Sequence, residues 1–195
     1  MTYYSDNALV LFEQYHQSDP GSMHADWLQY LPGKPGLACD IGAGTGRDAN
    51  WLAQQGWEVF AVEPEAAFRE AGKKLSHANV AWLDDYLPEL SELYRLNQRF
   101  DLILLSAVWM HLPEAERERA FRNLTELLAP GGRLVISLRH SSNEEEVRVR
   151  GFYCVSVGEL EQLAEEREVS LISVTSKPDG QGRDYVSWET MVFQR

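Results

Sequence analysis

Residues 37–46 read LACDIGAGTG, a short apolar run that passes through an acid into three alternating glycines. A helical pattern follows at residues 47–55. A buried strand that turns through glycines into a helix can cradle a ligand, because glycine adopts backbone dihedrals closed to other residues and lets a ligand approach the main chain. In open α/β sheets the ligand lies beyond the carboxyl ends of the strands, beside the first strand.

The spacing of these glycines differs from that of the dinucleotide-binding loop. That loop reads G-x-G-x-x-G, because a pyrophosphate must lie against a helix N-terminus. Here the third glycine comes one residue early, and Arg47 stands in the expected place. The acid before the turn, Asp40, fits an amine or a cation better than a phosphate.

The pattern D-x-G-x-G-x-G after a strand resembles motif I of the class I S-adenosylmethionine (SAM) methyltransferases. The resemblance implies that the turn with Gly42, Ala43 and Gly44 faces the methionine part of SAM. It also implies that Asp40 helps to hold the amino group of SAM. The turn LAPGG at residues 128–132, before an apolar strand, is similar to a structural turn of the same family.

A second acid, Glu63, follows the apolar run at residues 57–62 and precedes Pro64. It lies one predicted helix and one predicted strand beyond the glycine turn. An acid at the tip of the second strand can accept hydrogen bonds from both ribose hydroxyls of a nucleoside. NAD enzymes share this feature, so it indicates a nucleoside without specifying which one.

Two adjacent acids, Asp84 and Asp85, follow the strand predicted at residues 79–83. The resemblance implies an acid at this place that meets the exocyclic amine of adenine. Alternatively, the two carboxylates only cap the helix predicted at residues 87–96.

The run FDLILL at residues 100–105 is nearly continuously apolar, as expected for a central parallel strand buried on both faces. The resemblance implies that the tip of this strand, beginning at Ser106, borders the methyl group that is transferred. His111 is the candidate general base, because an imidazole can take a proton near neutral pH; otherwise it only caps the next helix. Trp109 is a candidate wall of the acceptor pocket or a core residue.

Two further regions contribute candidates for the acceptor pocket. Residues 1–32 show helical spacing at 8–15 and 23–31, which predicts either helices that cover the sheet or a lid with aromatic residues such as Tyr15. Arg139 begins a polar stretch, residues 139–153, that we expect to be a loop at the same rim. Arginines gather there in an otherwise acidic chain, and they either bind an acceptor carboxylate or phosphate or are ordinary solvated side chains.

Composition limits the classes of partner. The 195 residues carry 30 acidic and 18 basic side chains, a formal charge of −12, which repels nucleic acid and anionic membranes. Two cysteines, no signal peptide and no long apolar run predict a cytoplasmic protein. We expect a monomer or a homodimer. No metal site is expected, because no His/Cys/Asp cluster has metal-ligand spacing.

The predicted fold is an α/β three-layer Rossmann-like sandwich, whose seven-stranded, mostly parallel sheet ends in a C-terminal antiparallel hairpin. We expect one domain over residues 1–195, with a helical cap at 1–32 and a SAM-binding core at 37–195. The expected function is SAM-dependent methyl transfer by in-line displacement to an unidentified small-molecule acceptor. The alternatives are a non-catalytic SAM-binding scaffold or sensor and an NAD-dependent oxidoreductase, which the glycine spacing, Asp40 and the hairpin oppose.

Overall fold

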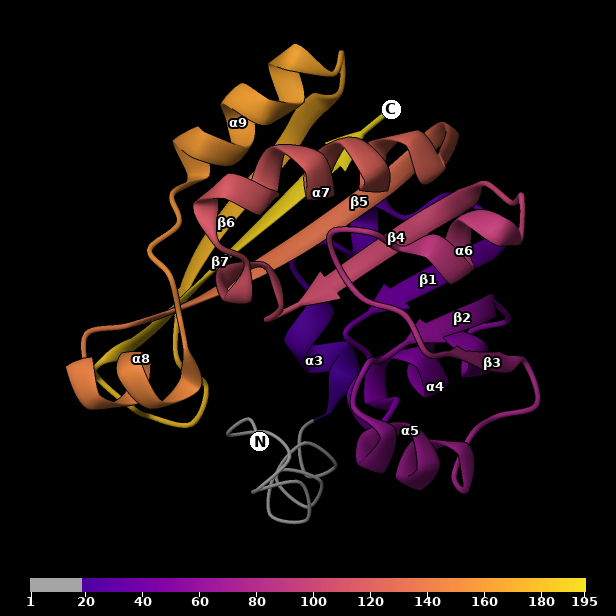
Figure 1. Cartoon of the computed structure of the whole chain (residues 1–195), viewed down its shortest axis with the longest axis horizontal. Helices are drawn as coiled ribbons and strands as arrows, with labels where there is room; N and C mark the ends of the chain where they lie inside the picture. The colour runs from indigo at the N-terminus through magenta and orange to yellow at the C-terminus, as the bar shows by residue number, and fades with distance from the viewer. Residues whose placement is uncertain (1–18) are drawn as a thin grey trace.

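The computed structural model describes residues 19–195, and within them the chain alternates strands and helices (Figure 1). The strands are β1 (Leu37–Ile41), β2 (Glu58–Val62), β3 (Val80–Leu83), β4 (Phe100–Ser106), β5 (Leu128–Ser141), β6 (Ser170–Pro178) and β7 (Val186–Gln194). The helices are α3 (Pro20–His24), η1 (Leu28–Tyr30), α4 (Arg47–Gln54), α5 (Ala66–Lys73), α6 (Ser91–Arg95), η2 (Trp109–His111), α7 (Glu114–Leu127), α8 (Glu144–Arg150) and α9 (Val157–Glu166).

The described strands form one sheet in the order β3-β2-β1-β4-β5-β7-β6. Neighbours from β3 to β5 are parallel, whereas β7 lies antiparallel to both β5 and β6. The predicted fold class, including the terminal hairpin, is confirmed. Because β1 has β2 on one side and β4 on the other, the chain reverses its direction of winding beside β1, and a crevice forms there at the carboxyl ends.

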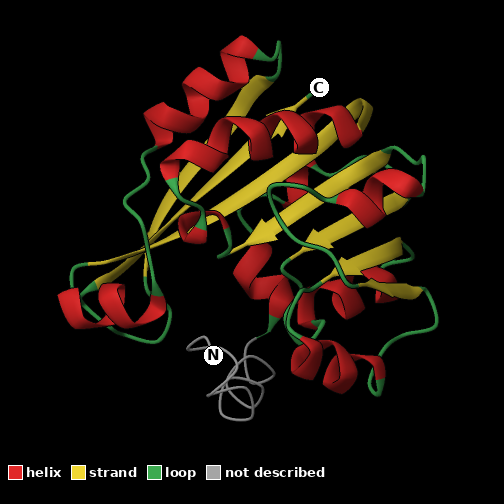
Figure 2. Cartoon of the chain, in the orientation of Figure 1, coloured by secondary structure: helices red, strands yellow, loops and turns green. Residues whose placement is uncertain are grey.

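Helices cover both faces of this sheet and make three layers (Figure 2). One buried cluster joins the sheet to α6, α7 and α9, and the other joins it to α4 and to Trp27. The central strand β4 is buried on both faces, with Leu102, Ile103 and Leu105 each 0% exposed. This explains its continuous apolar sequence.

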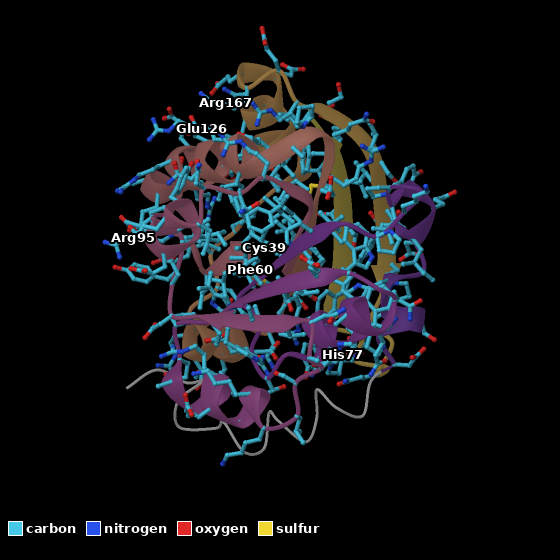
Figure 3. The ribbon with its side chains drawn as sticks, turned by 90° about the vertical axis from the view of Figure 1, so that its right-hand side faces the viewer. Cys39, Phe60, His77, Arg95, Glu126 and Arg167 are labelled. Carbon is cyan, nitrogen blue, oxygen red and sulfur yellow. The ribbon has the colours of Figure 1, made fainter. Side chains whose placement is uncertain are left out.

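Figure 3 shows Cys39 and Phe60 in the interior, and they are paired in the register of β1 and β2. Arg95, His77 and Arg167 point outward in the same view, and Arg167 lies 3.1 Å from Glu126 on the surface. Burial raises the pKa of the Cys39 thiol well above its ordinary value. Cys39 is therefore an unreactive part of the core.

Residues 139–153 are not the loop that the sequence predicts. Strand β5 continues to Ser141, because β7 pairs with it as far as that residue. Helix α8 follows, and its first turn is capped by Asn143, whose side chain accepts from the backbone N–H of Glu146. Three acids in the first turn and two arginines in the last favour this helix electrostatically.

Two smaller expectations also change. Residues 23–31 form the end of α3 and the short η1 in place of one helix. The segment LAPGG at residues 128–132, predicted as a turn before the strand, is part of β5. The pairing of β5 with β4 is irregular there, because its register shifts between Phe100 and Leu102. The helix predicted at residues 8–15 lies outside the described residues. No helix within residues 19–195 is long and apolar enough to cross a membrane.

Candidate functional site

A cavity of about 900 Å³ opens at the carboxyl ends of the central strands. This volume lies in the range of small-molecule and cofactor sites. In Figure 1, α4 and α5 lie on one side of these strand ends, and α8 lies with the tip of the β6–β7 hairpin on the other. The predicted site residues that line it are Asp40, Gly42, Ala43, Gly44, Glu63, Pro64, Asp85, Ser106, His111 and Arg139.

The glycine turn forms the floor of the cavity. The backbone N–H groups of Gly42 and Ala43 both donate to the carbonyl of Val62, at 2.8 and 3.0 Å, which fixes the turn against β2. Gly42 has φ +70°, and a Cβ there would lie 2.5 Å from Val108. Gly44 has φ +57°, and a Cβ there would meet nothing within 4 Å. Gly44 is thus the position where a ligand can approach the main chain.

Asp40 stands at the end of β1 and is 2% exposed. Burial raises the pKa of its carboxyl well above the ordinary value, and Asp48 adds to the rise while Arg47 opposes it. The Oδ2 atom has no hydrogen-bond partner among the described residues, although the residue lines the cavity. A buried carboxyl oxygen without a partner is rare in folded proteins, and here it is suited to accept hydrogen bonds from a ligand amine.

Glu63 connects the tip of β2 to the glycine turn. Its two carboxylate oxygens accept from the backbone N–H groups of Gly44 and Glu65, each at 2.8 Å. Burial raises the pKa of Glu63 to about 7, and these two hydrogen bonds only partly oppose the rise. The acid and the glycine turn, which are 19 residues apart, therefore form one unit.

The structure separates the two acids that follow β3. Asp85 is 3% exposed and lines the cavity, and its carboxylate accepts from the backbone N–H groups of Tyr86 and Leu93 at 3.0 and 2.9 Å. It thus binds a backbone N–H group in the first turn of α6 and also lines the cavity. Asp84 is not part of the lining; its side chain is 68% exposed and lies 2.6 Å from Arg69.

The segment after β4 divides between cavity and core. Ser106 and His111 line the cavity, whereas Trp109 is 0% exposed and packs edge-on against Phe121, with ring centroids 6.1 Å apart. The structure therefore does not bring Trp109 to the acceptor pocket, because the η2 turn directs its indole toward α7. Tyr15, the other aromatic candidate, lies outside the described residues.

His111 lies at the edge of the cavity against the segment that follows α8. Its ring is 5.1 Å from the ring of Phe152, and it forms hydrogen bonds with the backbone at Arg150 and Gly151. Burial lowers the pKa of His111 to about 4, and the charge of Arg150 adds to this. The imidazole is therefore neutral at pH 7 and can accept a proton, but it is a weaker base than an ordinary histidine.

Arg139 lines the cavity from the end of β5, as predicted for a residue of the substrate pocket. It is 6% exposed, and its guanidinium forms a forked ion pair with Glu146 at 2.8–3.0 Å. The same guanidinium lies 5.6 Å from the ring centre of Phe152. A forked pair of this kind fixes the arginine in one orientation.

A buried network that the sequence does not predict lies beside the glycine turn. Asp48 lies 2.8 Å from Arg47 and 3.1 Å from His24, and the indole N–H of Trp27 donates to the other ring nitrogen of His24. Although burial acts in the opposite direction, these two partners hold the pKa of Asp48 well below its usual range. The network ties the segment before the sheet to the cavity floor. An acid in a first helical turn is too common a pattern to have shown it.

No group of three or more His, Cys, Asp or Glu side chains within residues 19–195 has the geometry of a metal site.

Comparisons with known proteins agree with this geometry. A family model described as a methyltransferase domain matches residues 39–134, from β1 into β5. An uncharacterized methyltransferase from Geobacillus kaustophilus is 29% identical over 167 residues, which cover 74% of this chain and 76% of that protein.

Solved structures share the fold at low identity. The N-methyltransferase NodS from Bradyrhizobium japonicum WM9, in complex with S-adenosyl-L-homocysteine, superposes with a TM-score of 0.69 at 18% identity, over 94% of this chain and 86% of that one. Magnesium protoporphyrin IX methyltransferase from Synechocystis PCC 6803, with the same compound bound, gives 0.75 at 16% identity, over 99% and 96%. With the family match over residues 39–134 and the order of the sheet, these findings show that the chain is similar to S-adenosylmethionine-dependent methyltransferases in sequence and in fold.

Proposed function

We propose that the cavity binds SAM at the glycine turn and that the chain transfers its methyl group to a small-molecule acceptor. The observation that carries this proposal is the arrangement of Asp40, Gly44 and Glu63. A buried carboxyl oxygen without a partner, an open glycine and a second buried acid converge at the switch point of the sheet. This set offers acceptors for an amine and for hydroxyls, which fits the amino acid and ribose parts of SAM.

Each part of the turn has a distinct role in this proposal. Asp40 accepts from the amino group, and a cation beside it favours the ionised carboxylate that burial otherwise disfavours. The backbone at Ala43 and Gly44 contacts the methionine part. Glu63 accepts from the ribose hydroxyls, and Pro64 lies beside it. Asp85 lies at the adenine end, whereas Asp84 has no part in the site.

SAM supplies a methyl group that is already electrophilic, so the residues of this chain need only position an acceptor, exclude water and remove a proton. Positioning alone can lower such a barrier by about 7–11 kcal/mol. Ser106 ends β4 and lines the same cavity as the glycine turn and His111, and we place the reacting atom of the acceptor near it. His111, which is neutral at pH 7, takes the proton from an acceptor hydroxyl or amine.

A small acceptor fits the cavity better than a macromolecule. The cavity volume of about 900 Å³ is near the upper end for small-molecule sites, which leaves room beside a nucleoside. The formal charge of −12 opposes nucleic acid. Structural neighbours include a magnesium protoporphyrin IX methyltransferase and a glycopeptide N-methyltransferase, so the fold accommodates acceptors of very different shape.

Calorimetric titration tests the cofactor assignment. The wild-type protein is titrated with SAM, S-adenosylhomocysteine and NADH, and we expect binding of the first two only. Asp40→Asn should weaken SAM binding about tenfold or more, because it removes the charge that faces the amine. Asp84→Asn is the matched control, since its carboxylate is exposed and lies outside the cavity lining. Binding of NADH without binding of SAM would overturn the proposal.

A further inference from the structure

The two sides of the cavity carry opposite charge. On the side of β1, β2 and β3, the lining includes five acids, Asp40, Asp48, Glu63, Glu65 and Asp85, and one arginine, Arg47, which pairs with Asp48. On the other side it includes the arginines Arg139, Arg148, Arg150 and Arg183, which we call the arginine wall. These arginines come from the end of β5, from α8 and from the loop between β6 and β7, which lie together in Figure 1.

The carboxylates that pair with the arginine wall, Glu145, Glu146 and Asp179, do not line the cavity. Glu146 pairs with Arg139 at 2.8 Å and with Arg150 at 3.4 Å, and it also accepts from the hydroxyl of Ser141. Glu146 does not line the cavity, although both of its arginine partners do. Burial acts to raise the pKa of Glu146, but the hydrogen bonds from Arg139 and Ser141 hold it below its ordinary value. Glu146 therefore stays ionised and fixes two guanidinium groups at the cavity.

The same arrangement recurs at the hairpin. Asp179 accepts from both Nε and Nη2 of Arg183, at 2.9 and 2.8 Å, and from the indole of Trp188 at 3.1 Å. Arg183 and Trp188 line the cavity, whereas Asp179 does not. One further acid, Glu116, lines the cavity outside the side of β1, β2 and β3. It is exposed, so solvent screens its charge.

The arginine wall is joined to the proposed base. The ring of Phe152 lies between Arg139 and His111, 5.6 Å from the guanidinium carbon and 5.1 Å from the imidazole. The backbone N–H of Tyr153 donates to the carbonyl of Met110 at 2.8 Å, which holds this segment against η2. An anionic group bound on the wall would therefore be placed at a fixed distance from His111.

We propose that the acceptor carries an anionic oxygen group, a carboxylate or a phosphate, which binds to the arginine wall while its nucleophile faces His111. This inference rests on the proposed function, since it names the acceptor class of the same site. Guanidinium groups bind such oxygens through paired N–H donors, and their orientation here is fixed before the acceptor arrives. Phe152 and Trp188 add ring faces, so a planar acceptor with one anionic substituent suits the wall.

The test measures binding to protein saturated with S-adenosylhomocysteine. The probes are 4-hydroxybenzoate and anthranilate, each compared with its uncharged amide, and phenyl phosphate. We expect at least one of the anions to bind about tenfold more tightly than the amides, and the binding to weaken with salt. Preference for the acids over phenyl phosphate, or the reverse, identifies which anion the wall accepts.

Substitutions locate the effect. Arg150→Gln should weaken binding of the preferred anion about tenfold and leave the affinity for S-adenosylhomocysteine unchanged. Arg150→Lys keeps the charge without the fork and should give an intermediate loss. Arg95→Gln removes the same charge from the outer surface shown in Figure 3, and it should leave anion binding unchanged.

Three results would each overturn this inference: equal binding of acids and amides, no binding of any anion at millimolar concentration, or equal losses from Arg150→Gln and Arg95→Gln. If Arg150→Gln does not fold, the comparison of acid with amide on the wild type still decides. Failure of S-adenosylhomocysteine to bind is a separate result. It refutes the cofactor assignment, whereas anion binding to the arginine wall is then measured on the protein without this compound.

Discussion

The substitution Glu63→Gln tests whether burial at the floor of the cavity destabilises the ionised form of Glu63. Burial raises the pKa of Glu63 from 4.5 to about 7, against two backbone hydrogen bonds that favour the ionised form. A rise of this size corresponds to ~3 kcal/mol between the protonated and ionised forms in the folded protein. Glutamine has nearly the same shape, keeps one oxygen as an acceptor and does not ionise.

The sign of the pH dependence follows from linkage. Between the pKa of an ordinary glutamate and that of Glu63, the folded protein holds a proton that the unfolded chain has released. The free energy of unfolding contributed by this group is therefore highest at low pH and falls as the pH rises through about 7. The variant lacks this fall, so its stability relative to wild type should improve by up to ~3 kcal/mol between about pH 5 and about pH 8.

Urea unfolding, followed by tryptophan fluorescence across this pH range and without ligand, measures the difference. Glu58→Gln is the matched control, because Glu58 lies at the other end of the same strand and is exposed. Asp40, whose pKa is raised as well, titrates in both proteins, and the charge of Glu63 is only the smallest of the causes of that rise, so comparison with wild type at the same pH removes most of its contribution. If the stability difference between Glu63→Gln and wild type is the same at both ends of the range, the reasoning about burial is wrong.

Three further predictions concern the turn, the base and the packing of α7. Gly44→Ala should cost roughly 1 kcal/mol of stability, because φ at this position is +57°. In calorimetry it should also weaken SAM binding by more than the control variant Asp84→Asn does. His111→Ala should lower kcat by about 10²–10⁴-fold with the affinity for SAM unchanged, and wild-type kcat should show no rise near pH 6.5, because the pKa of His111 is about 4. Arg117→Ala should cost about 3–5 kcal/mol in urea unfolding, because this buried guanidinium donates to the carbonyl of Leu112 and leaves Glu159 without its ion pair.

Most of the sheet and the floor of the site were predictable because their signals are local. The strand at residues 37–41 carries its acid and its glycines within one turn, and Glu63 follows the next strand directly. Because β1 and β2 pair in parallel, their carboxyl ends lie at the same edge of the sheet. Predicting the two strands is therefore enough to predict that Asp40, the glycine turn and Glu63 lie close together. The register joins Ile41 to Val62, one residue before Gly42 and Glu63.

The residues that sequence analysis placed less well depend on backbone direction. Asp84 and Asp85 are adjacent in extended chain, so their side chains point to opposite sides, and one is buried while the other is exposed. The periodicity of four residues in β3 does not show which one faces the cavity. The direction of the Trp109 side chain is set by the 3-10 turn η2 and by its packing on Phe121. Packing of this kind involves residues far along the chain and leaves no local pattern.

The raised pKa values of Asp40 and Glu63 point to a common origin. Each acid is disfavoured as a carboxylate in the free protein, and each lines the same cavity beside the glycine turn. Burying an ionisable group in this way costs stability, and the neighbouring protein groups oppose the rise in pKa only in part, so a bound partner that favours the carboxylates would offset more of the cost. An amine next to Asp40 and hydroxyls next to Glu63 would both favour the carboxylate form and so release protons on binding. The cost of burying these two acids in the empty cavity and the affinity of the proposed site therefore have the same physical cause, because a ligand would supply further partners to the ionised carboxylates.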